Sequence, residues 1–159
     1  MQYSAAVITV SDRSSRGERE DVSGPLAVTA LREAGFACDD PIVIPDGADN
    51  VELALRAAVT DGIRVIVTTG GTGVGPRDET PEGTRRVLTR MIPGIAEELR
   101  RRATAERPAG MLSRGVSGVA EAAVIVNLPG SPGAVESGMP VVLSVAPHLL
   151  GQLRGDDHR

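Results

Sequence analysis

The residues that could do chemistry in this chain gather where a β-branched run stops at a series of glycines. Residues 63–69 are followed by Gly70, Gly71 and Gly73, and then by the acidic Asp78 and the start of a helix. A strand, a glycine turn and a helix in this order place main-chain amides against a phosphate, because glycine accepts positive φ and lets a ligand approach the backbone. The stretch predicts an anion site. The neighbouring carboxylate either belongs to a phosphate–metal site or simply favours the helix N-terminus electrostatically.

Two familiar nucleotide-binding motifs do not fit this stretch. A Walker P-loop ends in Gly-Lys-Ser/Thr, but the chain has no lysine, and all 17 of its basic residues are arginine. The glycines at 71, 73 and 75 read G-x-G-x-G, which differs from the G-x-G-x-x-G of dinucleotide-binding folds.

Composition narrows the chemistry further. The only histidines are His148 and His158, which argues against a histidine-rich zinc site and a Ser–His triad. The aromatic residues are Tyr3 and Phe36 alone, and the net charge is −4, so neither base stacking nor attraction to a nucleic-acid backbone is expected. Carboxylates, arginines, hydroxyls, amides and Mg²⁺ remain, and these suit phosphoryl or nucleotidyl transfer.

The same inventory bears on cellular location. A single cysteine, Cys38, allows no intrachain disulfide and suits a reducing cytosol. No apolar run approaches the length of a membrane span, and no secretory signal is visible at the start. We therefore expect a cytoplasmic protein with no membrane contact.

The pattern of apolar residues predicts one domain over residues 1–159, with a tail that frays at 155–159. Strands are expected at 5–10, 36–44, 63–69 and 122–126, and Pro41 is expected to make the second of these irregular or an edge strand. Helices are expected at 26–34, 50–61, 80–92, 95–105 and 134–153. Strands that alternate with helices favour an α/β fold of three layers, in which helices cover both faces of a mostly parallel sheet. Residues 11–20 and 108–118 are interpreted as loops.

Finer expectations concern helix ends and surface pairs. Asn50 and Thr80 are predicted to cap helices, and the last helix is predicted to break near 139–140. Ion pairs are expected for Glu97 with Arg101 and for Glu98 with Arg102.

The loops that follow the strands should converge on one edge of such a sheet. These loops are 11–13, 45–47, 70–78 and 127–133. Their convergence brings Asp46 close to Asp78, and two carboxylates beside an amide nest can bind Mg²⁺ and phosphate together. Ordinary turn chemistry of Pro-Asp-Gly is the alternative explanation of Asp46.

Six short motifs occur in a characteristic order along the chain: VSDR at 10–13, PD at 45–46, TGGTG at 69–73, RDETPE at 77–82, LSR at 112–114 and NLPGSP at 127–132. Together they resemble the Mog/MoaB family of molybdenum-cofactor biosynthesis proteins, to which the gephyrin G domain is related. The resemblance covers residues 4–154.

The resemblance implies a homotrimer that transfers AMP from ATP to the terminal phosphate of molybdopterin with Mg²⁺ as cofactor and releases pyrophosphate. A separate molybdate-insertion protein would be a downstream partner. Asp46 and Asp78 match the family's critical aspartates, which implies catalytic and Mg²⁺-binding roles. Substrate or nucleotide binding is implied for Ser11, Asp12, Thr69, Gly70, Gly71, Thr72, Gly73, Ser113, Arg114, Asn127, Pro129, Gly130, Ser131 and Pro132.

Three alternatives stay open at the level of sequence. The first is a catalytically silent MoaB-type trimer that binds molybdopterin or acts as a scaffold. The second is the related domain of molybdate-insertion or nucleotide-hydrolysing proteins, and the third is a flavodoxin-like phosphate binder.

Overall fold

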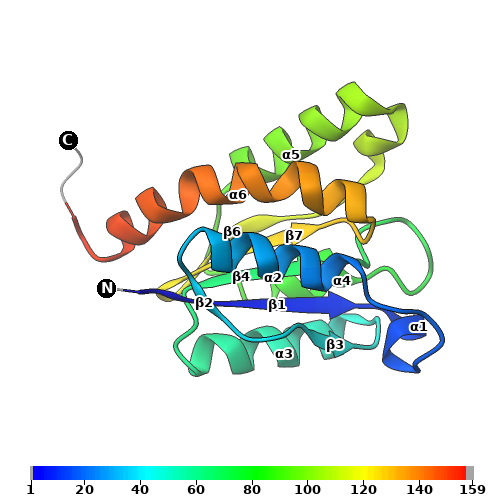
Figure 1. The fold of residues 1–159 in the computed structure, drawn as a ribbon, viewed down its shortest axis with the longest axis horizontal. Coiled ribbons are helices and arrows are strands. Elements are labelled where there is room, and N and C mark those ends of the chain that lie inside the picture. Colours follow the sequence, from blue (N-terminus) through cyan, green and yellow to red (C-terminus); the bar gives the residue numbers. More distant parts are fainter. Residues whose placement is uncertain (1, 157–159) are drawn as a thin grey trace.

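The computed structural model describes residues 2–156, which form three layers around one mixed β-sheet (Figure 1). The strand order is β2-β1-β4-β7-β6-β5, and β3 also pairs with β1. The strands are β1 (Ser4–Val10), β2 (Ala37–Cys38), β3 (Ile42–Ile44), β4 (Val65–Thr69), β5 (Arg90–Met91), β6 (Ser117–Ala120) and β7 (Ala123–Leu128). β1, β2, β3, β4 and β7 pair in parallel, and β6 pairs antiparallel with β7 and β5. The predicted mostly parallel α/β sheet is therefore confirmed.

Helices cover both faces of this sheet. On one side lie α2 (Ser23–Glu33), α5 (Pro93–Glu106) and α6 (Pro132–Leu153), and on the other lie α3 (Ala48–Thr60) and α4 (Thr80–Arg85) (Figure 1). Two short elements, α1 (Asp12–Ser15) and the 3-10 helix η1 (Pro108–Leu112), lie in connecting segments.

The alternation of side chains along β4 separates two apolar cores. Val65 and Val67 pack with α2 and α6, whereas Ile66 packs with α3 on the opposite face. All five residues of β4 are buried, because a parallel strand covered on both faces has no side that water can reach. Aliphatic side chains dominate both cores, as the scarcity of aromatic residues predicts.

The order of strands creates a switch point beside β1. The chain leaves β1 through α2 toward β3 on one side of the strand, and α3 then carries it to β4 on the other side. Ligands in open α/β sheets bind at such a point, beyond the carboxyl ends of the strands.

Four predicted segments differ from the structure. The helix expected over 80–92 ends at Arg85 as α4, and the strand β5 lies within the rest of that segment. The strand expected over 36–44 is two short strands on either side of Pro41, since proline has no N–H to give the ladder. Segment 108–118, expected as a loop, contains η1 and the start of β6, and segment 11–20 contains α1. β6 lacked a clear apolar pattern in the sequence because its residues are small. Its packing requires a small residue at position 118, since a Cβ on Gly118 would lie 2.3 Å from the Arg90 carbonyl oxygen.

Two predicted caps are also wrong. α3 begins at Ala48, two residues before Asn50, and the amide of Ala48 donates to Glu79 Oε2 at 2.9 Å. Thr80 lies inside α4, and its hydroxyl donates to the carbonyl of Gly70 at 2.9 Å. It thus ties the helix to the glycine loop instead of capping the helix.

The predicted break in the last helix is absent. α6 continues through Pro140 and Pro147, both of which are exposed, so water can solvate the carbonyl that each proline leaves without an amide partner. On α5, Glu98 accepts hydrogen bonds from both Arg101 and Arg102, so Arg101 pairs with Glu98 and the expected pair with Glu97 does not form.

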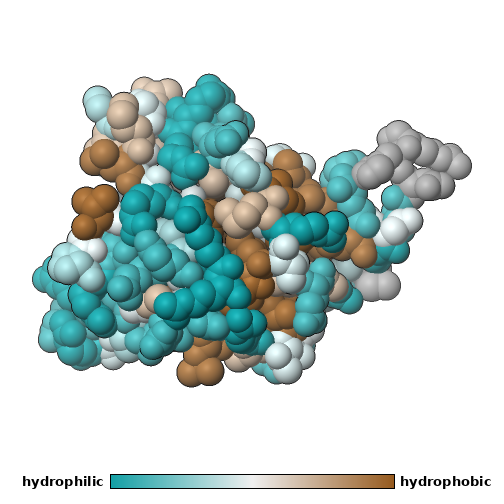
Figure 2. Space-filling view, turned by 180° about the vertical axis from the view of Figure 1, so that it is seen from behind, coloured by the Kyte–Doolittle hydropathy of each residue, from teal (hydrophilic) through white to brown (hydrophobic). Residues whose placement is uncertain are grey.

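The end of the described chain is a turn closed by the amides of Gly155 and Asp156, and the frayed tail predicted for 155–159 otherwise lies outside the described residues. Seen from the side opposite to Figure 1, polar side chains cover most of the surface, and apolar ones gather in a band near its middle (Figure 2). None of the helices within 2–156 has the length and apolarity needed to cross a lipid bilayer.

Candidate functional site

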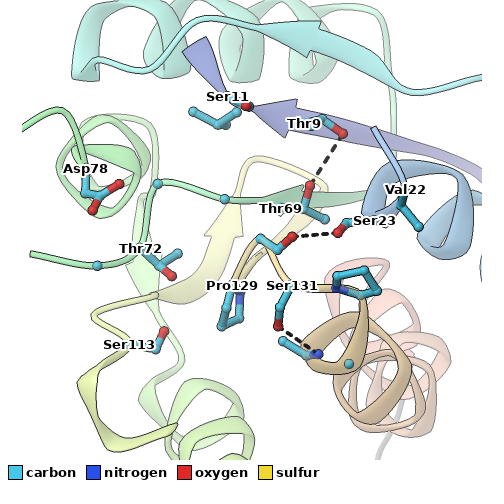
Figure 3. Close-up of a pocket in the computed structure, with 18 of the residues that line it drawn as sticks. Thr9, Ser11, Val22, Ser23, Thr69, Thr72, Asp78, Ser113, Pro129 and Ser131 are labelled. Atoms are coloured by element: carbon cyan, nitrogen blue, oxygen red, sulfur yellow. Dashed lines mark hydrogen bonds between the residues drawn. The ribbon is translucent and has the colours of Figure 1, made fainter. Parts of the chain in front are cut away.

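A cavity of about 680 Å³ opens at the carboxyl edge of the sheet (Figure 3). The loops after β1, β3, β4 and β7 all contribute to its lining, which confirms their predicted convergence. Most of the residues predicted from the sequence line it, namely Ser11, Asp46, Thr69, Gly70, Gly71, Thr72, Gly73, Asp78, Ser113, Pro129, Gly130, Ser131 and Pro132.

The glycine loop is built by close backbone packing. Gly70 and Gly71 have φ of +92° and +68°. A Cβ on Gly70 would lie 2.3 Å from the Val10 carbonyl oxygen, and one on Gly71 would lie 2.1 Å from Thr80 Oγ1. Glycine is therefore required here both by the positive φ and by the neighbouring chain.

The fold leaves the amides of this loop free for a ligand. Among residues 2–156, the amides of Gly71, Thr72 and Gly73 donate to no acceptor, although all three residues line the cavity. Consecutive free amides at the end of a strand form a nest for an anion.

Asp46 is joined to Asp12 by reciprocal hydrogen bonds between two loops. The amide of Asp12 donates to Asp46 Oδ2 at 2.8 Å, and the amide of Asp46 donates to Asp12 Oδ1 at 3.1 Å. Burial raises the pKa of Asp46 above its usual value, and the charges of Asp12 and Asp78 add to this. A hydrogen bond from Arg77 instead lowers the pKa of Asp12.

Asp78 closes the far end of the glycine loop. Its Oδ2 accepts from the amide of Gly75 at 2.9 Å. A Cβ on Gly73 would lie 2.9 Å from this oxygen, so a larger residue at position 73 would displace the carboxylate.

Three predicted residues do not line the cavity. Asp12 faces Asp46 and Arg77, as described above. Asn127 is buried, its side-chain amide donates to Thr68 and Thr84, and its Oδ1 accepts from the amide of Val116. It therefore connects β7 to its neighbours.

Arg114 lies behind the glycine loop. Its guanidinium donates to the carbonyls of Gly73 at 2.8 Å and Asp78 at 2.7 Å, and it pairs with Glu82. These bonds hold Arg114 against the glycine loop, and the ligand-binding role that the resemblance implies stays a prediction.

Sequence reasoning missed the side of the cavity formed by α2. Thr9 Oγ1 donates to Asp21 Oδ2 at 2.7 Å. Ser23 Oγ donates to the carbonyl of Gly130 at 2.6 Å (Figure 3). Asp21 Oδ1 accepts from the amide of Gly24 at 2.9 Å, which is the bond that an N-cap makes. The spacing of Asp21 and Gly24 was thus a signal for the start of α2.

Two arginines also line the cavity and were not predicted. Arg19 follows α1 and Arg107 follows α5, and neither side chain makes a hydrogen bond or ion pair within residues 2–156. The other charged residues of the lining are acidic: Glu20, Asp21, Asp46, Asp78 and Glu106.

Asp46 and Asp78 are the residues of the cavity that could hold a Mg²⁺ ion together with a substrate phosphate. Asp46 Oδ1 and Asp78 Oδ1 accept no hydrogen bond from any residue in 2–156. No group of three or more acidic, histidine or cysteine side chains in that range could hold a metal alone. Mg²⁺ is commonly bound by one or two carboxylates and completes its shell with substrate phosphates and water.

Fold and cavity together define an α/β protein in which a glycine loop with free backbone amides lies beside two carboxylates. Residues 6–149 match the family model described as "Probable molybdopterin binding domain". The chain belongs to the Mog/MoaB family of molybdenum-cofactor biosynthesis proteins.

Relatives of known name agree with this assignment. The chain is 38% identical to the molybdenum cofactor biosynthesis bifunctional protein of Synechococcus elongatus, covering 97% of this chain and 48% of the relative. It is 36% identical to the molybdopterin adenylyltransferase of Pyrococcus furiosus, covering 96% and 92%. The solved molybdopterin biosynthesis Mog protein of Mycobacterium ulcerans is 43% identical, with a TM-score of 0.90 and coverage of 95% and 99%. The chain spans about half the length of the two bifunctional relatives that it matches.

Proposed function

We propose that this chain is a molybdopterin adenylyltransferase, which transfers AMP from ATP to the terminal phosphate of molybdopterin. The observation that carries the proposal is the pair Asp46 and Asp78, which reach one cavity from two loops on either side of free backbone amides. Relatives of nearly the same length, 36% identical to this chain, bear the name of this activity, which supports the same reaction here.

The chain's own groups would act mainly by position and charge. The free amides of Gly71, Thr72 and Gly73 would bind nonbridging phosphate oxygens. Arg19 and Arg107 are the lining cations, so they are candidates to balance the charge of departing pyrophosphate in a protein without lysine.

The balance of charge in the cavity favours a divalent cation. The lining carries more carboxylates than guanidinium groups, yet both proposed substrates carry phosphates. Asp46 and Asp78 would hold Mg²⁺, which would supply positive charge to the phosphate oxygens.

The reaction itself needs no general base. An oxygen of the molybdopterin phosphate attacks the α-phosphorus of ATP and forms a new phosphoanhydride bond. The bond from the α-phosphorus to the bridging oxygen breaks, and its electron pair leaves with pyrophosphate. A phosphate dianion carries no proton that must first be removed.

The test is to incubate the protein with molybdopterin, ATP and Mg²⁺ and to measure adenylylated molybdopterin and pyrophosphate. Equal amounts of both products support the proposal. Tight molybdopterin binding without either product would identify the silent binding or scaffolding protein instead.

We further propose that the active form is a homotrimer and that a separate molybdate-insertion protein receives the product. Both proposals follow from the family resemblance.

A further inference from the structure

The main-chain carbonyls of the two aspartates are bound in the same way by two different arginines. Arg77 Nη2 donates to the carbonyl of Asp46 at 2.9 Å, and Arg114 Nη2 donates to the carbonyl of Asp78 at 2.7 Å. Neither arginine lines the cavity, so both act from behind the loops that carry the carboxylates.

Arg77 connects three loops through one guanidinium. Its Nε and Nη2 donate to the carboxylate of Asp12 at 3.1 and 3.2 Å, while Nη2 also reaches Asp46. Because Asp12 and Asp46 already exchange hydrogen bonds, Arg77 locks the loop after β1 and the loop after β3 to the glycine loop.

Arg114 fixes the glycine loop at both ends of its exposed part. Its Nε binds the carbonyl of Gly73, its Nη2 binds that of Asp78, and its own amide donates to the carbonyl of Thr72 at 2.9 Å. The pairing with Glu82 holds the guanidinium in place and lowers the pKa of that carboxyl.

Such support is needed because this loop is rich in glycine. Glycine has the greatest backbone freedom of any residue, so residues 70–75 would sample many conformations without tethers. A displacement of about 1 Å at a reacting centre can cost roughly 100-fold in rate.

We propose that Arg77 and Arg114 are positioning residues that hold Asp46 and Asp78 at the separation required to share one divalent cation with the substrate phosphates. This inference depends on the proposed adenylyl transfer only in the kinetic measurement, because hydrogen exchange and Mn²⁺ binding need no turnover. Arg114 in particular acts on the protein backbone and not on the pterin or the phosphate.

The test compares Arg114→Gln and Arg77→Gln with Arg102→Gln, which removes an exposed ion pair on α5 and does not touch the cavity lining. Hydrogen exchange of the free protein is measured first. We expect the amides of Gly75 and Asp78 to exchange at least about tenfold faster in Arg114→Gln than in wild type, while the amides of β4 in the same variant keep their wild-type rates. In Arg102→Gln the loop amides should also exchange at the wild-type rate. Equal exchange of the loop in wild type and Arg114→Gln would overturn the inference.

Cation binding gives a second readout that does not need turnover. Mn²⁺ titrated in the presence of ATP should bind about tenfold more weakly to each loop variant than to wild type and to Arg102→Gln. Unchanged Mn²⁺ affinity in both loop variants would contradict the positioning role. Arg114→Lys should not restore affinity, because an ammonium lacks the planar fork that reaches two carbonyls at once.

Kinetics separate positioning from direct substrate contact. Positioning predicts that kcat falls by about tenfold or more while KM for molybdopterin changes less than about threefold. A large rise in KM at unchanged kcat would show that Arg114 binds substrate and would overturn the inference. If wild-type protein makes no adenylylated product, the proposed function fails, and the exchange and Mn²⁺ measurements still decide the positioning role.

Discussion

Asp46 and its hydrogen-bond partner Asp12 occupy different electrostatic environments. Asp46 is half-buried and close to two like charges, which raise its pKa, whereas Asp12 beside it is stabilised as an anion by Arg77. Keeping Asp46 ionised at neutral pH therefore costs stability, as is common where a fold positions charge for a ligand.

The first prediction concerns charge at the two aspartates. Asp78→Asn and Asp46→Asn should each lower kcat about 100-fold, which corresponds to roughly 2.7 kcal/mol of transition-state stabilisation. The double variant should be little worse, since both carboxylates would serve one metal-bound transition state. Rates are measured at saturating ATP over a range of Mg²⁺ concentrations, with the exposed Asp61→Asn as control. Near-normal rates in Asp78→Asn would mean that the Asp78 carboxylate only favours the N-terminus of the following helix, an interaction that contributes about 0.3–1 kcal/mol to stability.

The second prediction concerns stability and pH. Because the folded pKa of Asp46 is raised, its ionised form disfavours the folded state, and Asp46→Asn should melt at a higher temperature than wild type at pH 7. The difference should shrink as the pH falls through the raised folded pKa and vanish below about 4, where the unfolded state of wild type also binds the proton. Asp12→Asn should melt lower than wild type at pH 7, because its pKa is lowered in the folded state. Thermal melts in the absence of Mg²⁺ measure both, and an Asp46→Asn protein that melts lower would contradict the argument.

The third prediction concerns the two unpaired arginines of the cavity. Arg19→Gln and Arg107→Gln should each raise KM for ATP or lower kcat by about tenfold, because a charge-assisted bond to phosphate is worth roughly 1.5–3 kcal/mol. Arg90→Gln, an exposed arginine on β5 outside the cavity, should leave both constants unchanged. If neither cavity variant differs from Arg90→Gln in initial-rate measurements, the charge of pyrophosphate is balanced by other groups.

At the scale of elements, long apolar patterns predicted the fold well. The buried strands β1, β4 and β7 and the helix α2 follow from runs of apolar residues, and the convergence of their loops follows from parallel pairing. β5 and β6 did not, because β5 has only two residues and pairs with a strand distant in sequence, and β6 is built of small residues with no clear apolar pattern.

The site could be predicted only in part for a related reason. Motif order identified the loops, but it could not show that Asn127 and Arg114 turn their polar groups toward the protein. Arg107 enters the cavity because η1 packs against α5, an arrangement that no local pattern indicates.

The fourth prediction tests the junction between the glycine loop and α4. Gly71→Ala should destabilise the protein by about 1–3 kcal/mol, because it combines a positive φ with a Cβ that meets Thr80 Oγ1. Thr80→Ala should partly relieve the second cost, so the double variant should be less destabilised than the sum of the single ones. Gly94→Ala is the control, since its Cβ meets no atom within 4 Å and alanine favours the helix. Denaturant unfolding measures the stability of the two single variants, the double variant and the control. If the free-energy changes of Gly71→Ala and Thr80→Ala are strictly additive, the predicted clash between the two side chains does not exist.

At the scale of the whole molecule, the three layers place the cavity at one edge of the sheet and leave apolar side chains exposed elsewhere. Ile42 and Val43 on β3, Leu53 on α3 and Met91 on β5 are all exposed, and Figure 2 shows an apolar band on one face. β2, β3 and β5, which lie at the margins of the sheet, are only two or three residues long, so they offer little edge for an extended strand to join. Contact between copies would therefore occur mainly through side chains.

The last prediction is that the protein assembles as a homotrimer. Light scattering at micromolar concentration should give three times the chain mass of 16.5 kDa. Because association stabilises the folded state by mass action, the melting temperature should also rise with protein concentration. Replacing Leu53, which is 72% exposed, and Met91, which is 43% exposed, one at a time by glutamate would locate the contact, since only the variant whose side chain is buried between copies should lower the mass. A monomer mass together with a melting temperature independent of concentration would reject the trimer while leaving the single-chain cavity and its two aspartates as the unit of activity.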